Sequence, residues 1–119
     1  MKKIDLNGIF PPIPTPFKNN KVAHDHLKEN LNKWSRTGLK GFVAMGSNGE
    51  YVYLSPEEKR AVVKTVVDNT PRSMSVIAGT GCESTQETID LTNDCAQIGA
   101  KAALVVTPYY YGGRMTDDA

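Results

Sequence analysis

The chain has 119 residues, of which 39% are hydrophobic and 23% charged, and its 14 basic and 13 acidic side chains leave a formal net charge of +1. This balance is typical of a globular protein and argues against a nucleic-acid partner, which needs a basic surface. No apolar run approaches the roughly 20 residues that cross a bilayer, and the two cysteines, Cys82 and Cys95, form neither a disulfide framework nor a zinc motif, so no membrane partner and no metal are expected.

Four apolar runs follow one another along the chain. The first, residues 8–13, contains two prolines, which a strand tolerates only at its end or edge. The runs at 41–46, 75–79 and 102–107 are almost continuously apolar. That pattern is typical of strands buried on both faces of a parallel sheet.

Helical patterns fill the gaps between these runs. The first ends at Gly38, a residue that favours helix termination. Ser55 and Ser84 each open a sequence typical of a capping box, so each is expected to begin a helix. The apolar stripes of the three helices are predicted from helical spacing. They consist of Leu27, Leu31 and Trp34, then Val62, Val63, Val66 and Val67, then Ile89, Leu91, Cys95, Ala96 and Ile98.

The spacing of the runs predicts a repeated strand–helix unit of the α/β class. Strands are expected to start near residues 9, 42, 76 and 103, at intervals of 33, 34 and 27 residues. Such a period is typical of parallel strands with right-handed helical crossovers, which form a doubly wound sheet or a (β/α)8 barrel. A barrel needs roughly 250 residues. We therefore interpret residues 1–119 as one partial TIM-barrel domain, the N-terminal half with strands 1 to 4.

The last of the four units is expected to be incomplete. Residues 114–119 are predicted to form only the start of a fourth helix. Without that helix, strand 4 would leave an open apolar edge at residues 104–106.

Candidate functional groups are expected on the loops that follow the strands. Loop 46–50 places Ser47 and Asn48 between two glycines, which suits a carboxylate or phosphate oxygen but equally fits a plain tight turn. Loop 107–113 contains three tyrosines, which either face a ligand or another subunit or form an exposed aromatic rim. None of the ten lysines is expected at the carboxyl end of a strand, where a nucleophilic amine would be built.

The histidines and cysteines are assigned to structure rather than chemistry. His24 and His26 fall at the start of the first helix, away from the strand ends, and are expected to be solvated. Cys82 precedes the third helix with no basic neighbour in the sequence, and Cys95 falls on that helix's buried stripe.

Three motifs together resemble a known family. They are residues 8–17 (GIFPPIPTPF), residues 46–50 (GSNGE) and residues 106–110 (VTPYY). In this order and spacing they resemble the dihydrodipicolinate synthase / N-acetylneuraminate lyase family, (β/α)8 barrel enzymes of the Schiff-base type. The Ser-Asn pair, residues 81–86 and residues 113–115 look most like the branch of 4-hydroxy-2-oxoglutarate aldolases of animals, which split that substrate into pyruvate and glyoxylate.

The resemblance implies roles for individual residues. Ser47 and Asn48 match the positions that bind the carboxylate of a 2-oxo acid, and the Ser47 hydroxyl would also take part in a proton relay. Tyr110 matches the tyrosine that reaches across a dimer interface and completes the relay of the neighbouring subunit. Glu50 would brace the loop. The family implies a homo-oligomer, a dimer or tetramer, with no metal and no cofactor.

The resemblance also implies what these residues lack. The family's Schiff-base lysine lies on the sixth strand and its proton-shuttling tyrosine on the fifth, so the 119-residue chain alone is expected to be inactive. Its full-length parent is expected to cleave 4-hydroxy-2-oxoglutarate. One alternative is a dihydrodipicolinate synthase or another pyruvate-dependent aldolase of the family. Another is a non-enzymatic truncated remnant that associates with full-length subunits.

The branch of the family bears on the compartment as well. The animal-type resemblance implies a mitochondrial location. Since the sequence shows no presequence at Met1, a cytoplasmic location is the alternative.

Overall fold

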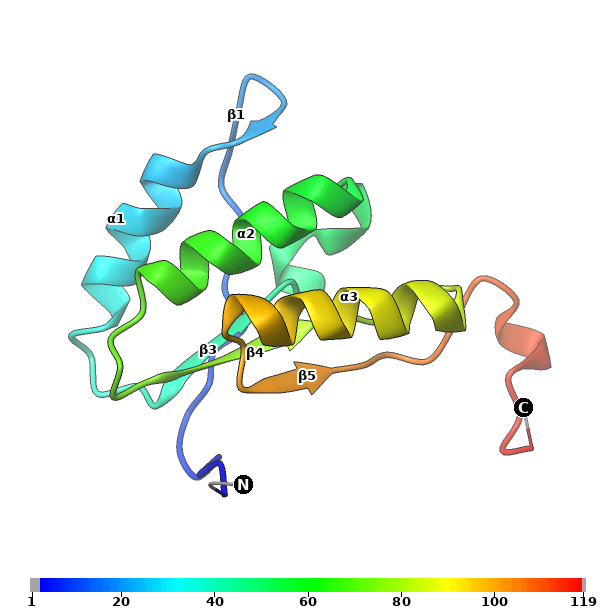
Figure 1. The fold of residues 1–119 in the computed structure, drawn as a ribbon. Coiled ribbons are helices and arrows are strands. Elements are labelled where there is room, and N and C mark those ends of the chain that lie inside the picture. Colours follow the sequence, from blue (N-terminus) through cyan, green and yellow to red (C-terminus); the bar gives the residue numbers. More distant parts are fainter. Residues whose placement is uncertain (1–2, 119) are drawn as a thin grey trace.

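The computed structural model describes residues 3–118, which form one layer of helices on a three-stranded sheet, together with a separate two-stranded hairpin. The sheet is parallel, and its strand order is β3 (Gly41–Ala44), β4 (Ser75–Gly79) and β5 (Ala102–Leu104). The helices lie together on one side of this sheet (Figure 1), and they are α1 (His24–Trp34), α2 (Pro56–Asp68) and α3 (Thr85–Ile98). The alternation of strands and helices confirms the predicted α/β class. No helix among the described residues is long and apolar enough to span a membrane.

The first apolar run lies beside β3 without becoming a regular strand. Val43 donates its N–H to the Pro11 carbonyl (2.9 Å) and accepts the Ile13 N–H (3.0 Å). Pro12 forms an isolated parallel bridge with Val43. Because Pro11 and Pro12 have no N–H to donate, the ladder is interrupted there.

A short hairpin, which the sequence patterns did not predict, precedes α1. Its strands β1 (Phe17–Lys18) and β2 (Lys21–Val22) pair in antiparallel register. The two turn residues, Asn19 and Asn20, have φ angles of 52° and 59°. Asparagine adopts this left-handed conformation more readily than most residues, so the Asn-Asn pair was the signal for the turn.

The core lies between the sheet and the helices. Phe42, Ala44, Val76 and Ala78 alternate along β3 and β4 and are buried, as are Leu27, Leu31, Val62, Val63, Val66, Leu91 and Cys95 of the helices. Burial also raises the pKa of the Cys95 thiol to about 11, because the apolar surroundings disfavour the thiolate.

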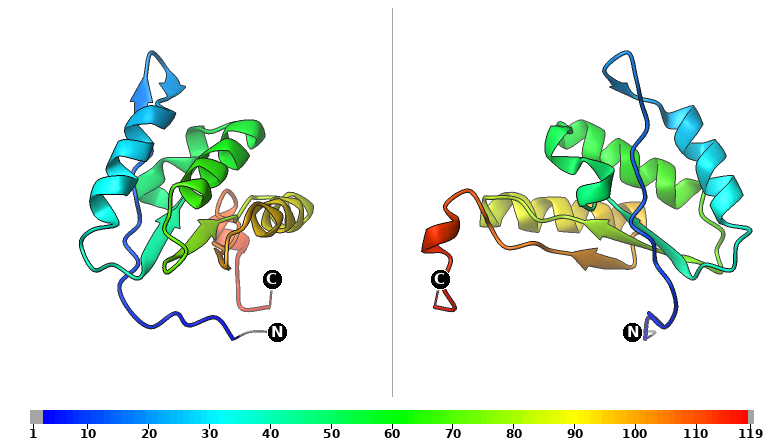
Figure 2. Two further views of the ribbon diagram at one scale, coloured as in Figure 1. Left: turned by 60° about the vertical axis from the view of Figure 1, so that its left-hand side comes forward. Right: turned by 180° about the vertical axis from the view of Figure 1, so that it is seen from behind.

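The opposite face of the sheet is only partly covered within the described residues, which differs from the prediction of strands buried on both faces. Val43 and Ile77, which point to that face, are only half-buried. Within residues 3–118 no second layer of helices covers it (Figure 2). The predicted stripe of α3 is also partly wrong, since Ile89 is exposed together with Ala96.

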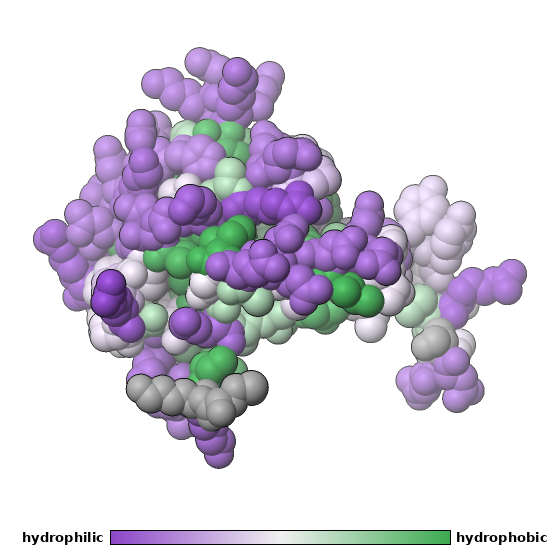
Figure 3. Space-filling view, in the orientation of Figure 1, coloured by the Kyte–Doolittle hydropathy of each residue, from purple (hydrophilic) through white to green (hydrophobic). Residues whose placement is uncertain are grey.

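The last strand leaves an exposed apolar edge, as the sequence predicted. Leu104, Val105 and Val106 keep 53%, 54% and 45% of their surface exposed. The space-filling view shows apolar side chains along the lower side of the molecule, beneath α3 (Figure 3). The regular strand ends at Leu104 rather than at residue 107, because its partner β4 ends at Gly79, directly opposite Leu104.

The end of the described chain also differs from the prediction. Residues 114–118 do not begin an α-helix. One turn of 3-10 helix, Gly112–Arg114, is followed by irregular chain and a turn. Residue 119, the last of the predicted helix start, lies outside the described residues.

The two predicted capping sequences behave differently. Ser55 forms a full capping box with Glu58: its hydroxyl accepts the Glu58 N–H at 3.2 Å, and the Glu58 carboxylate accepts the Ser55 N–H at 2.8 Å. Ser84 accepts the Glu87 N–H at 3.3 Å, but within residues 3–118 the Glu87 side chain returns no bond. The α3 cap is therefore half of the predicted box.

This difference makes the Ser55 cap testable. We expect Ser55→Ala to lower the free energy of unfolding by about 1 kcal/mol, because it leaves the Glu58 N–H at the start of α2 without its acceptor. Ser84→Ala removes the equivalent single bond to the Glu87 N–H and should cost a similar amount, whereas Glu58→Ala, which removes the reciprocal bond, should cost more than Glu87→Ala. Urea unfolding followed by circular dichroism measures these losses, and equal losses for Glu58→Ala and Glu87→Ala would contradict the reciprocal role of Glu58.

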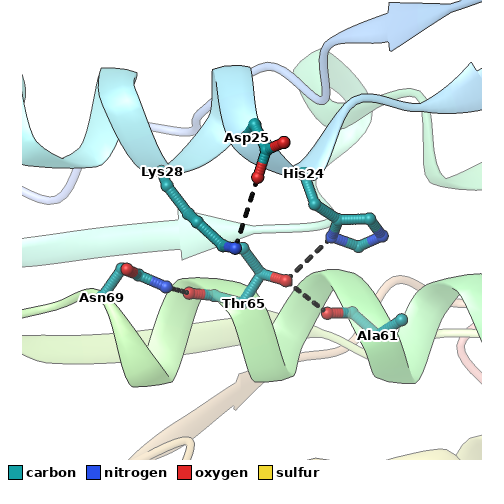
Figure 4. Close-up of polar contacts among 6 residues, drawn as sticks. All are labelled: His24, Asp25, Lys28, Ala61, Thr65 and Asn69. Atoms are coloured by element: carbon teal, nitrogen blue, oxygen red, sulfur yellow. Dashed lines mark hydrogen bonds and ion pairs between the residues drawn. The ribbon is translucent and has the colours of Figure 1, made fainter.

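His24 joins two helices instead of being solvated. Its ring nitrogen Nδ1 lies 2.8 Å from the Thr65 hydroxyl of α2, and Thr65 in turn donates to the Ala61 carbonyl at 3.0 Å (Figure 4). His26 is exposed, as predicted. The contact of His24 could not be predicted, because Thr65 is 41 residues away in the sequence.

Candidate active site

A small cavity lies where the carboxyl ends of β3 and β4 meet the chain that leaves β5. Its volume is about 80 Å³. The first of the predicted loops contributes Ser47 to its wall. The other lining residues are Met45, Gly46, Tyr51, Gly79, Gly81, Leu104 and Val106. The cavity is thus apolar apart from the Ser47 and Tyr51 side chains and the exposed backbone of the loops.

The loop between β3 and α2 is folded into two consecutive turns of 3-10 helix, η1 (Ser47–Gly49) and η2 (Tyr51–Tyr53). Two non-glycine residues with left-handed backbone flank η1: Met45, with φ of 59°, and Glu50, with φ of 54°. Each such residue costs of order 1–3 kcal/mol and persists only where the surrounding structure imposes it. Strain of this kind on both sides of a loop is frequent at functional sites.

Ser47 and Asn48 offer several hydrogen-bond donors to a ligand. Both residues are exposed. Within residues 3–118 their backbone N–H groups donate no hydrogen bond, whereas the next two, of Gly49 and Glu50, donate to Gly46 (2.9 Å) and Ser47 (3.0 Å). Two free N–H groups beside a hydroxyl and an amide suit a carboxylate oxygen. Only Ser47 lines the cavity itself.

Glu50 acts on the loop through its backbone. Its N–H closes η1 on the Ser47 carbonyl, and its own carbonyl accepts the Tyr53 N–H at 3.0 Å. Its left-handed conformation connects η1 to η2. These bonds involve the Glu50 backbone alone, so the role of its side chain as a brace of the loop stays a prediction.

Two glycines allow the walls of the cavity to approach each other. A Cβ atom on Gly79 would lie 2.1 Å from the Met45 carbonyl oxygen. A Cβ atom on Gly81 would lie 2.7 Å from Val106 Cγ1 and 2.8 Å from the Val106 backbone. Real Cβ atoms do not come this close to backbone, so both positions require glycine.

Tyr110 does not join Ser47 at the cavity. It is 76% exposed and does not line the cavity, and its ring packs edge-on against Tyr111 with the centroids 4.9 Å apart. The segment that carries both rings extends past the N-terminal end of α3 (Figures 1 and 2). The role of Tyr110 in a neighbouring subunit therefore stays a prediction.

The cavity contains a tyrosine that the sequence patterns did not single out. Tyr51 donates its hydroxyl proton to the Tyr109 hydroxyl at 3.4 Å. This hydrogen bond, together with partial burial, raises the pKa of Tyr51 to about 12. Its place directly after Glu50 in the motif was the available signal.

Neither an amine nor a metal-binding cluster is found at this site. Among residues 3–118 no lysine lines the cavity, and no group of three His, Cys, Asp or Glu side chains could bind a metal ion. The Lys59 Nζ lies 5.6 Å from the centroid of the Tyr51 ring, but Lys59 does not line the cavity. Lys2 lies outside the described residues.

Comparisons with known proteins identify the fold and the family. A family model described as the dihydrodipicolinate synthetase family matches residues 5–117. The 4-hydroxy-tetrahydrodipicolinate synthase of Methanocaldococcus jannaschii is 45% identical over 105 residues, which cover 88% of this chain and 36% of the relative. This chain thus spans little more than a third of the length of that relative.

Solved structures agree with this match. A dihydrodipicolinate synthase superposes with a TM-score of 0.87 at 42% identity, over 93% of this chain and 38% of its own. The chloride-inhibited synthase of Acinetobacter baumannii, complexed with pyruvate, superposes with a TM-score of 0.86 at 37% identity. The match covers 96% of this chain and 39% of that structure's chain. The α/β fold therefore matches part of the barrel of these enzymes. None of the three proteins compared is named a 4-hydroxy-2-oxoglutarate aldolase, the branch that the motifs resemble.

The match of residues 5–117 spans nearly all of the sequence and includes the three motifs that carry the resemblance. The chain belongs to the dihydrodipicolinate synthetase family.

Proposed function

We propose that loop 46–50 binds the carboxylate of a small 2-oxo acid, such as pyruvate, in a Schiff-base lyase. The free N–H groups of Ser47, which lines the cavity, and of its neighbour Asn48 carry this proposal. Donors in a partly apolar site bind a carboxylate more strongly than the same donors in water. The pyruvate in the Acinetobacter enzyme supports this ligand class.

The same geometry defines what the loop contributes to the reaction. In Schiff-base chemistry a lysine amine adds to the ketone, and the adduct loses water to form an iminium. The iminium withdraws electrons from the bond that is made or broken. The loop fixes the acid end of the substrate, and the Ser47 hydroxyl passes a proton at the reacting end. The amine comes from outside these residues, because no described lysine lines the cavity.

We propose that residues 1–119 form strands 1 to 4 of a (β/α)8 barrel whose remaining strands supply the amine. Tyr110 then completes the proton relay of a second subunit in a homo-oligomer. Tyr110 is 76% exposed and lies on a segment that extends away from the sheet and helices, which supports this assignment.

For the whole protein we propose the activity of a 4-hydroxy-tetrahydrodipicolinate synthase. The relative with 45% identity supports this specificity. A second candidate is 4-hydroxy-2-oxoglutarate aldolase, which the Ser47–Asn48 pair favours. Release of glyoxylate from 4-hydroxy-2-oxoglutarate by the full-length protein would establish the aldolase, and its absence alongside synthase activity would exclude it.

Two measurements on this chain test the role of the loop. In NMR titrations with pyruvate we expect the amide signals of Ser47 and Asn48 to shift, and Ser47→Ala to weaken binding. Ser73→Ala, which removes an exposed serine of a distant turn, should leave binding unchanged. Pyruvate followed by borohydride should leave no adduct on any lysine. A stable lysine adduct, or signals at Ser47 and Asn48 that do not move, would contradict the proposal.

A further inference from the structure

The segment after β5 leaves the body of the molecule. Figures 1 and 2 show residues 107–118 extending beyond the N-terminal end of α3, away from the sheet and the other helices. Tyr110 and Tyr111 are 76% and 74% exposed. A chain with so little packing samples many conformations unless specific bonds restrict it.

Glu83 supplies one such restraint. Its carboxylate accepts the Tyr109 N–H at 3.1 Å (Oε2) and 3.2 Å (Oε1), and it accepts the Tyr110 N–H at 3.0 Å (Oε2). One charged group therefore satisfies two successive backbone donors of the tyrosine segment. Hydrogen bonds to an ionised acceptor are stronger than those between neutral groups. Glu83 belongs to the loop after β4, so these bonds connect the loops of neighbouring strands.

Tyr51 supplies a second restraint from the loop after β3. Its hydroxyl donates to the Tyr109 hydroxyl at 3.4 Å, while the Lys59 ammonium lies 5.6 Å from the centroid of its ring. A cation at this distance is attracted to the face of the ring and favours one ring orientation. Tyr109 is thus bound at its backbone by one loop and at its hydroxyl by another.

We propose that Glu83 and Tyr51 are positioning residues that fix Tyr109 at both ends, so that the following residue, Tyr110, projects from the molecule in one defined direction. The inference rests on the proposed function in that Tyr110 acts in the site of a neighbouring subunit. Orienting such a tyrosine before the subunits meet strengthens their association, because ordering the segment at that moment would cost free energy.

Amide hydrogen exchange measures the first restraint without any substrate. In the unmodified chain the Tyr109 and Tyr110 amides should exchange more slowly than that of Tyr111, whose N–H donates no hydrogen bond within residues 3–118. Glu83→Ala should raise both rates by about tenfold. Glu83→Gln retains an acceptor oxygen and should keep the rates within about threefold of the original.

The matched control is Glu87→Ala. Glu87 is an exposed glutamate four residues further on, and its side chain forms no hydrogen bond among the described residues. Its removal changes the net charge equally but should leave the Tyr109 and Tyr110 amides unaffected. Unchanged exchange in Glu83→Ala, or equal exchange of all three tyrosine amides in the unmodified chain, would overturn the proposal. The comparison of the three tyrosine amides in the unmodified chain tests the proposal even if a variant does not fold.

The ionisation of Tyr51 measures the second restraint. Its raised pKa comes first from the hydrogen bond with Tyr109, then from burial and the charges of Tyr109, Cys82 and Glu83. Tyr109→Phe should therefore move the Tyr51 transition from near pH 12 toward its ordinary value of 10.0, as followed by tyrosinate absorbance or NMR. A Tyr51 transition near 10 in the unmodified chain would refute the hydroxyl contact. Neither experiment uses pyruvate, so their outcome is independent of the proposed ligand.

Discussion

Replacing Gly79 with alanine is expected to lower the free energy of unfolding by about 3 kcal/mol or more. The added Cβ would lie 2.1 Å from the carbonyl oxygen of Met45 and 2.8 Å from its carbonyl carbon. Both atoms belong to the backbone at the end of β3, which cannot rotate away as a side chain would. The carboxyl ends of β3 and β4 would have to separate, and with them the walls of the cavity.

Gly46→Ala is the matched control, since Gly46 lies at the end of β3 and lines the same cavity. The nearest atom to its added Cβ is the Pro12 Cβ at 3.7 Å, an ordinary contact. Its φ of −74° and ψ of −178° suit alanine. We expect a change within about 1 kcal/mol. Urea unfolding of both variants measures the difference, and equal stabilities would show that the strand ends are not as close as described.

Phe42→Ala is expected to lower the free energy of unfolding by about 3–5 kcal/mol. Phe42 lies in the middle of β3 with none of its surface exposed, and its ring centroid is 6.3 Å from that of Trp34. Removing the ring leaves a cavity between the sheet and α1 that rigid neighbours fill only in part. Since Trp34 is the single tryptophan, its fluorescence reports directly on this contact.

Phe17→Ala is the control for Phe42. Phe17 lies in the hairpin strand β1 and keeps 40% of its surface exposed. Its truncation should change the stability by less than about 1 kcal/mol and leave the emission of Trp34 unaltered. A large effect of Phe17→Ala, or a small one of Phe42→Ala, would contradict the assignment of the core to the space between sheet and helices.

Local sequence patterns predicted the elements that depend on neighbouring residues in the chain. The cap at Ser55 and the proline after it determine where α2 begins, and the apolar runs at β3 and β4 contain their own strand signal. The hairpin at Asn19 and Asn20 was missed although its signal is local as well. The expected helix start after residue 114 is not formed among the described residues, because so few residues cannot nucleate a helix by themselves.

The site was predictable in part. Loop 46–50 was recognised because glycines and polar residues follow a strand there, and Ser47 does line the cavity. Tyr51 and Glu83 were missed because their partners are distant: Tyr109 is 58 residues from Tyr51 and 26 from Glu83. Contacts of this kind arise from the order of strands in the sheet, which no local pattern contains.

The left-handed residues at both ends of η1 have a consequence for laboratory evolution. Met45 is almost entirely buried and Glu50 is held by backbone hydrogen bonds, so the path of the loop is determined outside Ser47 and Asn48, the two positions proposed to bind the ligand. Ser47 and Asn48 are exposed and contribute little to packing. Saturation libraries at these two positions should therefore yield mostly folded variants, and selection could redirect such a scaffold toward other small acids.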